Sequence, residues 1–130
     1  MTLGEVLRAH EYALTFGGRA GISDAGLIES AIARPYSGYH RSITRKAAAL
    51  LQSLAQNHGF VDGNKRTAIL MTSLLLVRSG YTFRIANEAA FNTEIEQMVL
   101  AVVRHELDFD QLVAWFRERI KRHQKGDFPD

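Results

Sequence analysis

The sequence contains no cysteine and only two prolines among its 130 residues. The absence of cysteine excludes a disulfide framework and a thiolate metal site, and it is compatible with a reducing cytoplasm. The longest apolar run, residues 68–77, is too short to span a bilayer and includes Thr72 and Ser73. The N-terminus has no basic segment followed by an apolar one, so we expect no signal peptide. We therefore expect a cytoplasmic protein that has no membrane partner.

Positive and negative side chains are nearly equal in number. Lys and Arg together number 16, against 14 for Asp and Glu, which gives a formal net charge of +2. Such a small excess is weak evidence for nucleic-acid binding, and we expect no nucleic-acid partner. Apolar residues make up 46% of the chain and charged residues 23%, the composition of a soluble globular protein. We expect one domain over residues 1–130, large enough to bury a core.

Apolar residues recur at helical spacing along most of the chain. This pattern predicts an all-α fold, a compact bundle of about six helices. The predicted helices cover residues 3–14, a short stretch between Asp24 and Pro35, residues 45–58, residues 64–79, a region after Asn87, and a last stretch from Asp108 to about Ile120. The helix at 45–58 is apolar nearly all round, so we expect it at the centre of the core, and the helix at 64–79 is also nearly apolar.

Helix ends are predicted from capping residues. Ser23 or Asp24 precedes the short second helix, and Thr44 is the expected cap of the third. Asp108 and Gln111 form a capping-box pattern at the start of the last helix. Gly80 is the expected C-terminal cap of the helix at 64–79, with a short extended segment after it at 81–85.

Two segments have no helical period. Residues 35–43 contain aromatics, a central glycine and cations, which favours an exposed loop or small hairpin that serves binding. The tail at 124–130 is polar and contains Pro129, so we expect it to fray.

Residues 58–66 concentrate the groups that can carry chemistry. They read His-Gly-Phe-Val-Asp-Gly-Asn-Lys-Arg. The nine positions include a base (His58), a carboxylate (Asp62), a backbone-freeing glycine (Gly63), an amide (Asn64) and two cations (Lys65 and Arg66). Phe60 stands alone among polar neighbours, which predicts an anchor that packs the loop onto the core.

This segment predicts a phosphate-handling site. A glycine-containing loop that opens onto a helix N-terminus presents unpaired N–H groups and a positive dipole end, which suit an anion. Phosphoryl transfer to a hydroxyl also needs a base and a carboxylate for Mg²⁺, and His58 and Asp62 are candidates. Lys65 and Arg66 lie in the first helical turn, where the dipole disfavours each cation by a few tenths to ~1 kcal/mol. A bound polyanion would reverse that effect.

Simpler interpretations exist for each residue alone. Asp62-Gly63 could form a hairpin turn, but the residues that follow have helical and not alternating periodicity. His58 alone would be an ordinary helix-end histidine, and Lys65 and Arg66 alone would be solvated surface charges. His58 and Asp62 make a weak zinc site because one histidine and one carboxylate are too few ligands. The joint pattern favours the phosphate site, because a plain loop needs none of these residues together.

The segment resembles the motif of the Fic/Doc family, His-x-Phe-x-(Asp/Glu)-Gly-Asn-(Gly or Lys)-Arg. The resemblance extends over roughly residues 3–120 and includes Gly17-Gly18 with Gly21, Ser30-Ala31 before Arg34-Pro35, and Ala47-Ala48. It implies a Fic-like helical bundle with a catalytic site. It assigns the following roles: general base to His58, Mg²⁺ ligand to Asp62, anion hole to Gly63, Asn64 and Lys65, and phosphate pairing to Arg66, with His58, Lys65 and Arg66 as the catalytic residues.

Two positions indicate the Doc (death-on-curing) branch. Family members that transfer AMP have glycine at the position of Lys65 and a second arginine at the position of Ile69. The Doc branch is similar to this chain there and binds ATP in the inverted direction, so that the γ-phosphoryl group is transferred. The resemblance therefore implies an ATP- and Mg²⁺-dependent, kinase-like toxin that halts protein synthesis by modifying elongation factor Tu. AMP transfer, or a non-enzymatic helical domain that binds RNA or an antitoxin, are the alternatives.

The resemblance also bears on partners and on the loop. We find no self-inhibitory Ser/Thr-x-x-x-Glu-Gly/Asn helix, which implies a separate antitoxin that inserts a helical segment into a groove. Residues 35–43 would correspond to the flap on which the target docks by strand addition. Gly59 stands where the family more often has proline, which predicts a looser loop.

Overall fold

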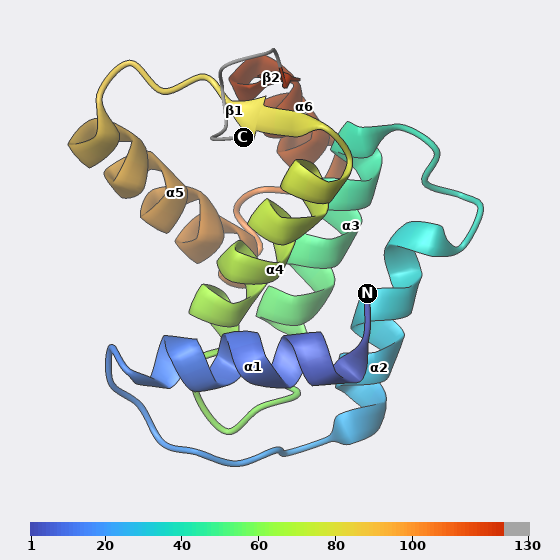
Figure 1. The fold of residues 1–130 in the computed structure, drawn as a ribbon, viewed down its shortest axis with the longest axis vertical. Helices are drawn as coiled ribbons and strands as arrows, with labels where there is room; N and C mark the ends of the chain where they lie inside the picture. Colours follow the sequence, from blue (N-terminus) through green and yellow to red (C-terminus); the bar gives the residue numbers. More distant parts are fainter. Residues whose placement is uncertain (124–130) are drawn as a thin grey trace.

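The computed structural model describes residues 1–123, and Figure 1 shows an all-α architecture in that part. The elements are α1 (Leu3–Leu14), α2 (Ala25–Ala33), the 3-10 helix η1 (Arg34–Tyr36), α3 (Ile43–Gln56), α4 (Asn64–Arg78), β1 (Tyr81–Phe83), α5 (Glu88–Val103), α6 (Phe109–Arg119) and β2 (Ile120–Arg122). The predicted bundle of about six helices is confirmed. The predicted fraying tail at 124–130 lies outside the described residues. No helix within residues 1–123 combines the length and apolarity needed to cross a bilayer.

Helix α3 forms the centre of the core. Its residues 47–51, three alanines followed by two leucines, are all at most 1% exposed. Small and unbranched side chains let neighbouring helices approach on several sides, and α3 contacts α2, α4, α5 and α6. Figure 1 shows α3 and α4 running side by side, with α1 lying across them. The central position predicted for the helix at 45–58 is confirmed.

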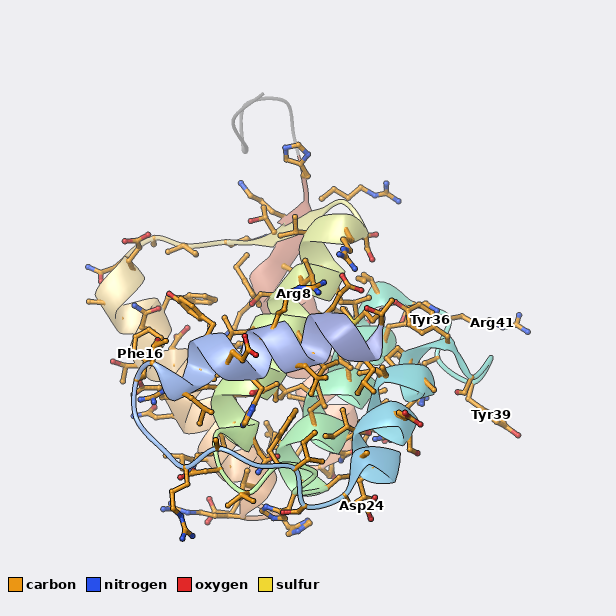
Figure 2. All side chains as sticks on the ribbon, turned by 60° about the horizontal axis from the view of Figure 1, so that its bottom comes forward. Arg8, Phe16, Asp24, Tyr36, Tyr39 and Arg41 are labelled. Atoms are coloured by element: carbon orange, nitrogen blue, oxygen red, sulfur yellow. The ribbon has the colours of Figure 1, made fainter. Side chains whose placement is uncertain are left out.

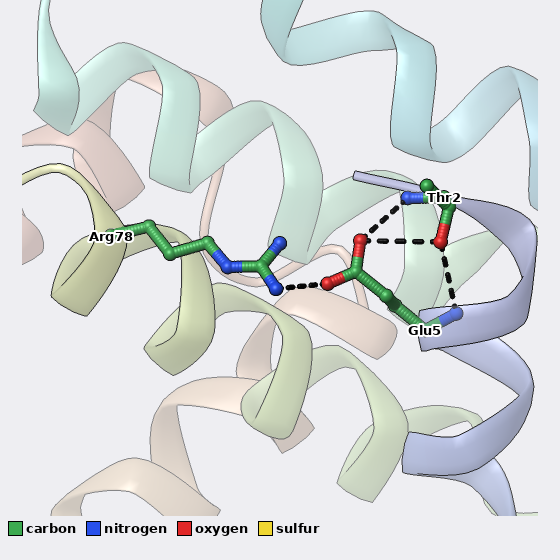
Figure 3. Close-up of polar contacts among 3 residues, drawn as sticks. All are labelled: Thr2, Glu5 and Arg78. Carbon is green, nitrogen blue, oxygen red and sulfur yellow. Dashed lines mark hydrogen bonds and ion pairs between the residues drawn. The ribbon is translucent and has the colours of Figure 1, made fainter.

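The start of α1 is fixed to the last turn of α4. Thr2 and Glu5 form a capping box, and the second Glu5 oxygen makes an ion pair with Arg78 (Figure 3). The Arg78 hydrogen bond lowers the pKa of Glu5 to about 2. These contacts hold α1 across α4, and the far end of α1 then lies beside the start of α4.

Most predicted helix caps agree with the structure, and one differs. Asn87 caps α5, and Asp108 and Gln111 form the predicted capping box of α6. Gly80 follows the C-cap of α4 with a φ of 83°, as expected for a C-terminal glycine. Helix α3, however, is capped by Ser42 and not by Thr44. Ser42 has extended backbone (φ −81°, ψ 154°), and its side chain accepts the N–H of Arg45.

A short sheet joins two distant segments. Residues 81–83 of the predicted extended segment pair antiparallel with residues 120–122, in the register Tyr81 to Arg122, Thr82 to Lys121 and Phe83 to Ile120. The sequence analysis placed Ile120 in the last helix, whereas α6 ends at Arg119. The pairing partner lies about forty residues away, and a local pattern cannot reveal such a contact.

The expected flap at residues 35–43 lies at the opposite end of α3 from the 58–66 motif. This segment begins within η1 and continues as an exposed loop, with Tyr39 84% exposed, and it forms no hairpin. It precedes α3, whereas His58 follows α3, and this helix of 14 residues is about 20 Å long. Figure 2 shows Tyr39 and Arg41 at one side of the molecule and Phe16 at the other. Residues 35–43 are therefore remote from the 58–66 motif.

Candidate active site

Two left-handed residues shape the loop between α3 and α4. His58 follows the C-cap of α3 with a φ of 52°, and Gly63 is the N-cap of α4 with a φ of 78°. Glycine adopts this conformation freely, but a residue with a side chain loses roughly 1–2 kcal/mol in it. These two left-handed residues turn the chain so that His58, after α3, and the first turn of α4 line the same cavity.

Phe60 and Asn64 hold this loop against the core. Phe60 is 2% exposed, so its predicted role as an anchor is confirmed. The Asn64 side chain accepts the Phe60 N–H at 3.1 Å and donates to the Phe60 carbonyl at 3.0 Å. The Asn64 amide, which the resemblance assigns to an anion hole, thus makes two hydrogen bonds to the loop backbone and keeps one further N–H donor. Asn64 also offers an anion its backbone N–H, in the first turn of α4.

The start of α4 has the properties of an anion site. Its N-cap Gly63 has no side chain, so no capping hydrogen bond is made to the first turn. The unpaired N–H groups and the helix dipole therefore remain available to a ligand. Lys65 and Arg66 are exposed in this turn, and the Arg66 guanidinium lies 5.1 Å from the ring centre of Phe16.

Asp62 is an ionised carboxylate beside this helix start. Its Oδ2 accepts the Arg19 N–H at 3.1 Å, and its Oδ1 accepts the Gly63 N–H at 2.9 Å. The hydrogen bond from Arg19, then that from Gly63, lowers the pKa of Asp62 below its ordinary value. Each oxygen retains a lone pair for a further partner.

The donor set around Asp62 fits magnesium better than zinc. Within residues 1–123 there is no group of three or more His, Cys, Asp or Glu side chains that could hold a metal. Zinc requires such a set, whereas Mg²⁺ commonly binds one carboxylate and completes its shell with substrate phosphates and water. The residues present are therefore compatible with a metal ion that arrives with a nucleotide.

An extended segment before α2 pairs with the motif loop. Ile22 forms an isolated antiparallel bridge with Phe60, and the Gly21 carbonyl accepts the Val61 N–H at 3.0 Å. The N–H groups of Ser23 and Asp24 both donate to the Gly59 carbonyl, at 2.8 and 3.0 Å. This segment, and not residues 35–43, lies against the motif.

Gly59 is tightly packed against α2. A Cβ atom at this position would lie 2.5 Å from Cγ1 of Ile28, so neither alanine nor proline fits without movement. The sequence analysis expected glycine in place of proline to loosen the loop. The structure shows a second consequence, because the absent side chain allows the loop to approach α2 closely.

These elements surround one cavity of about 710 Å³, a volume typical of small-molecule sites. One wall carries all the site residues predicted from sequence: His58, Asp62, Gly63, Asn64, Lys65 and Arg66. Residues 16–18 form the rim, and α5 supplies an apolar wall with Val99, Leu100 and Val103 and one carboxylate, Glu96. The apolar wall and the cationic wall suit a ligand with both a flat apolar part and phosphates.

The sequence analysis missed one residue behind this wall. His10 on α1 is 6% exposed, stacks on Phe60, and lies 2.7 Å from the Asp62 carbonyl. A signal was present, because His10 falls on the apolar stripe of α1 between the buried Val6 and Ala13. A polar side chain on a buried face needs a partner, but the sequence does not identify it.

One cavity of this helical bundle contains a histidine, a carboxylate and an uncapped helix N-terminus. This combination is typical of proteins that bind phosphorylated ligands. The sequence model of the Fic/DOC family matches residues 1–76. The chain is also 38% identical over 108 residues to "Toxin Doc" of Mycolicibacterium smegmatis (strain ATCC 700084 / mc(2)155), which covers 78% of the chain and 79% of that relative. The chain belongs to the Fic/DOC family. Proteins of this family are generally enzymes that transfer phosphate or nucleotide groups, and they generally bind a nucleotide with a divalent metal ion.

Proposed function

We propose that this protein is the toxin of a toxin–antitoxin system and that it transfers the γ-phosphoryl group of ATP to a protein hydroxyl. The observation that carries the proposal is the shared cavity, which joins His58 and Asp62 to the uncapped start of α4. The relative from Mycolicibacterium smegmatis is named a toxin, which supports the biological role.

The site residues have distinct tasks in this reaction. The hydroxyl oxygen of the target bonds to the γ-phosphorus, the bond to the bridging oxygen breaks, and ADP leaves. His58 accepts the hydroxyl proton on a ring nitrogen as general base. The N–H groups of the first turn of α4, together with Lys65 and Arg66, stabilise the charge on the transferring group.

Asp62 would hold the magnesium ion. When bound, Mg²⁺ neutralises phosphate charge and orients the phosphate oxygens. Hydrogen bonds from the Arg19 and Gly63 N–H groups lower the pKa of Asp62 below its ordinary value, so its carboxylate is ionised at neutral pH, as an unshifted aspartate would also be. The chain therefore offers a metal ligand that needs no deprotonation step.

The choice of phosphoryl over AMP transfer depends on Lys65 and Ile69. Family members that transfer AMP have a second arginine at the position of Ile69. In this chain Ile69 lines the cavity and adds an apolar surface to the α4 wall. The site thus has a cation at Lys65, where AMP-transferring members have glycine, and none at the position of that second arginine.

We propose elongation factor Tu as the target, by resemblance to the Doc branch, and hence a cytoplasmic location. Restraint of the toxin would come from a cognate antitoxin whose helical segment occupies a groove of the toxin. These finer assignments follow from the family resemblance and from the toxin name of the relative.

A transfer assay tests the proposal directly. The purified chain is incubated with Mg²⁺, elongation factor Tu and, in parallel, α- or γ-labelled ATP. We expect label in the target from γ-labelled ATP alone, and its loss in His58→Ala. His105→Ala is the matched control, because His105 is also exposed with a positive φ of 59° but does not line the cavity.

Other outcomes would contradict the proposal. Label from α-labelled ATP would mean AMP transfer, and would show that Lys65 does not set the nucleotide direction. Absence of label from either ATP, in both elongation factor Tu and a bacterial extract, would leave a binding module. Such a module would depend on salt and on basic surface residues such as Arg41 and Arg45.

A further inference from the structure

We propose that His10 is a positioning residue that fixes the peptide between Asp62 and Gly63, and through it the anion site at the start of α4. This inference rests on the proposed nucleotide-binding function. His10 comes from α1, outside the contiguous motif, and it is not among the cavity-lining residues. It therefore acts through the loop and not by contact with a ligand.

His10 contacts three residues of the motif at once. Its ring lies parallel to that of Phe60, with 3.7 Å between ring centres and 8° between planes. Its Nε2 lies 2.7 Å from the Asp62 carbonyl oxygen. A Cβ atom on Gly63 would be 3.3 Å from Cδ2 and Nε2 of His10, so the Gly63 backbone packs directly on the ring.

The hydrogen bond fixes the protonation of the ring. A carbonyl oxygen can only accept, so Nε2 must carry the proton and donate it. His10 is 6% exposed and its hydrogen bond to the Asp62 carbonyl is partly buried, so the loss of this donor would remove a hydrogen bond that holds the loop. A donor at the position of Nε2 is therefore a requirement of the loop.

The peptide between Asp62 and Gly63 is held at both ends. Its carbonyl oxygen accepts from His10, and its N–H donates to Oδ1 of Asp62. Rotation of this peptide plane would break both hydrogen bonds and release Gly63 from its left-handed conformation. Because Gly63 is the N-cap of α4, the direction of the first-turn N–H groups depends on it.

Two substitutions separate the contributions of His10. His10→Phe retains a ring to stack on Phe60 but lacks the donor. His10→Gln lacks the ring, but its amide N–H can occupy the position of Nε2. Val6→Ala is the control for general destabilisation, since Val6 is fully buried on the same helix, one turn earlier.

The experiment uses calorimetric titration with ATP, melting temperature, and hydrogen exchange of the Gly63 amide in the full chain. We expect His10→Phe to bind ATP roughly tenfold more weakly, the scale of one lost hydrogen bond, and to exchange the Gly63 amide faster. His10→Gln should remain within about threefold of the wild type in both. Val6→Ala should melt at a lower temperature with unchanged affinity.

The opposite results would overturn the inference. His10→Phe with native affinity and native exchange would show that the clamp is not needed. Equal losses in His10→Phe and Val6→Ala, in proportion to melting temperature, would mean a purely structural role. If the wild-type chain binds no ATP, the proposed function fails, and the Gly63 exchange rate still decides whether His10 holds the peptide.

Discussion

At the scale of single residues, His58 occupies a position that would suit glycine better. It stands directly after the C-cap of α3 with a φ of 52°, the place where helices most often have glycine. A histidine there stores strain, and strain of this kind is concentrated at functional sites. The side chain also projects from the end of a rigid helix into the cavity wall, where a base would be required.

The strain at His58 predicts that His58→Gly abolishes activity without lowering stability. Glycine relieves the left-handed strain, so we expect the free energy of unfolding to stay equal or rise by up to about 1 kcal/mol, while phosphoryl transfer is lost. Urea denaturation and the labelled-ATP assay measure the two effects. His58→Ala retains the strain and should lose activity without any gain in stability. An active His58→Gly variant would refute the role of base.

The lowered pKa of Asp62 predicts that the protein loses stability at acidic pH. Hydrogen bonds from Arg19 and Gly63 lower its pKa below the ordinary 3.8. A lowered pKa in the folded state means that ionised Asp62 stabilises the fold above its ordinary pKa, and that this contribution is lost as pH falls through the folded pKa. We expect the stability difference between wild type and Asp62→Asn to grow as pH rises toward the ordinary pKa of 3.8 and to stay constant well above it. Denaturation curves across this range provide the measurement, and parallel profiles for the two proteins would exclude the assigned hydrogen bonds.

At the scale of elements, the first turn of α4 carries its charges in an unfavourable place. Lys65 and Arg66 are cations at the positive end of a helix that has no side-chain cap. In the free protein they reduce stability, whereas with a bound polyphosphate they increase affinity. Removal of one of these cations is therefore expected to raise the stability of the free protein and to lower its affinity for the polyphosphate.

The prediction for this helix is that Lys65→Gln raises the stability of the free protein by a few tenths to ~1 kcal/mol and weakens ATP binding. Thermal denaturation without nucleotide and calorimetric titration with ATP test the two parts. Lys121→Gln serves as control, because Lys121 lies in β2, outside the cavity, and should leave ATP affinity unchanged. A Lys65→Gln variant that is less stable when free would show that the dipole argument does not govern this turn.

Elements with local signals were predicted well from sequence. The bounds of α1 and the caps of α5 and α6 follow from periodicity and from side chains within three residues of the helix start. The start of α3 was wrong by two residues, because Ser42 and Thr44 are both good caps and only backbone conformation distinguishes them. Strand β2 was missed because its formation depends on β1, and sequence periodicity contains no information on such a distant partner.

At the scale of the whole molecule, the candidate site also contains some residues that the sequence identified and others that it did not. The contiguous residues of the motif could be identified from sequence because one loop brings them together. The parts supplied by other elements could not: His10 behind the loop, the rim at 16–18 and the apolar wall of α5. Tertiary packing alone determines these neighbours, which come from segments far from the motif in the sequence.

A matched pair of glycines tests which segment serves the site. Gly18 and Gly38 have similar left-handed backbones, with φ of 109° and 91°, so alanine should strain both by about 1–2 kcal/mol. They differ in their surroundings. A Cβ on Gly18 would lie 3.0 Å from Oδ2 of Asp62, whereas a Cβ on Gly38 would have no atom within 4 Å.

We therefore expect Gly18→Ala to reduce magnesium-dependent phosphoryl transfer by about tenfold, because it displaces the carboxylate that would hold the metal. Gly38→Ala should lose similar stability but keep transfer within about twofold, since its loop is separated from His58 by the length of α3. Urea denaturation and transfer rates over a magnesium titration measure both. An equal loss of transfer in the two variants would mean that residues 35–43 also contribute to the site. If excess magnesium rescues Gly18→Ala alone, the 17–23 segment contributes to the site through its contact with Asp62.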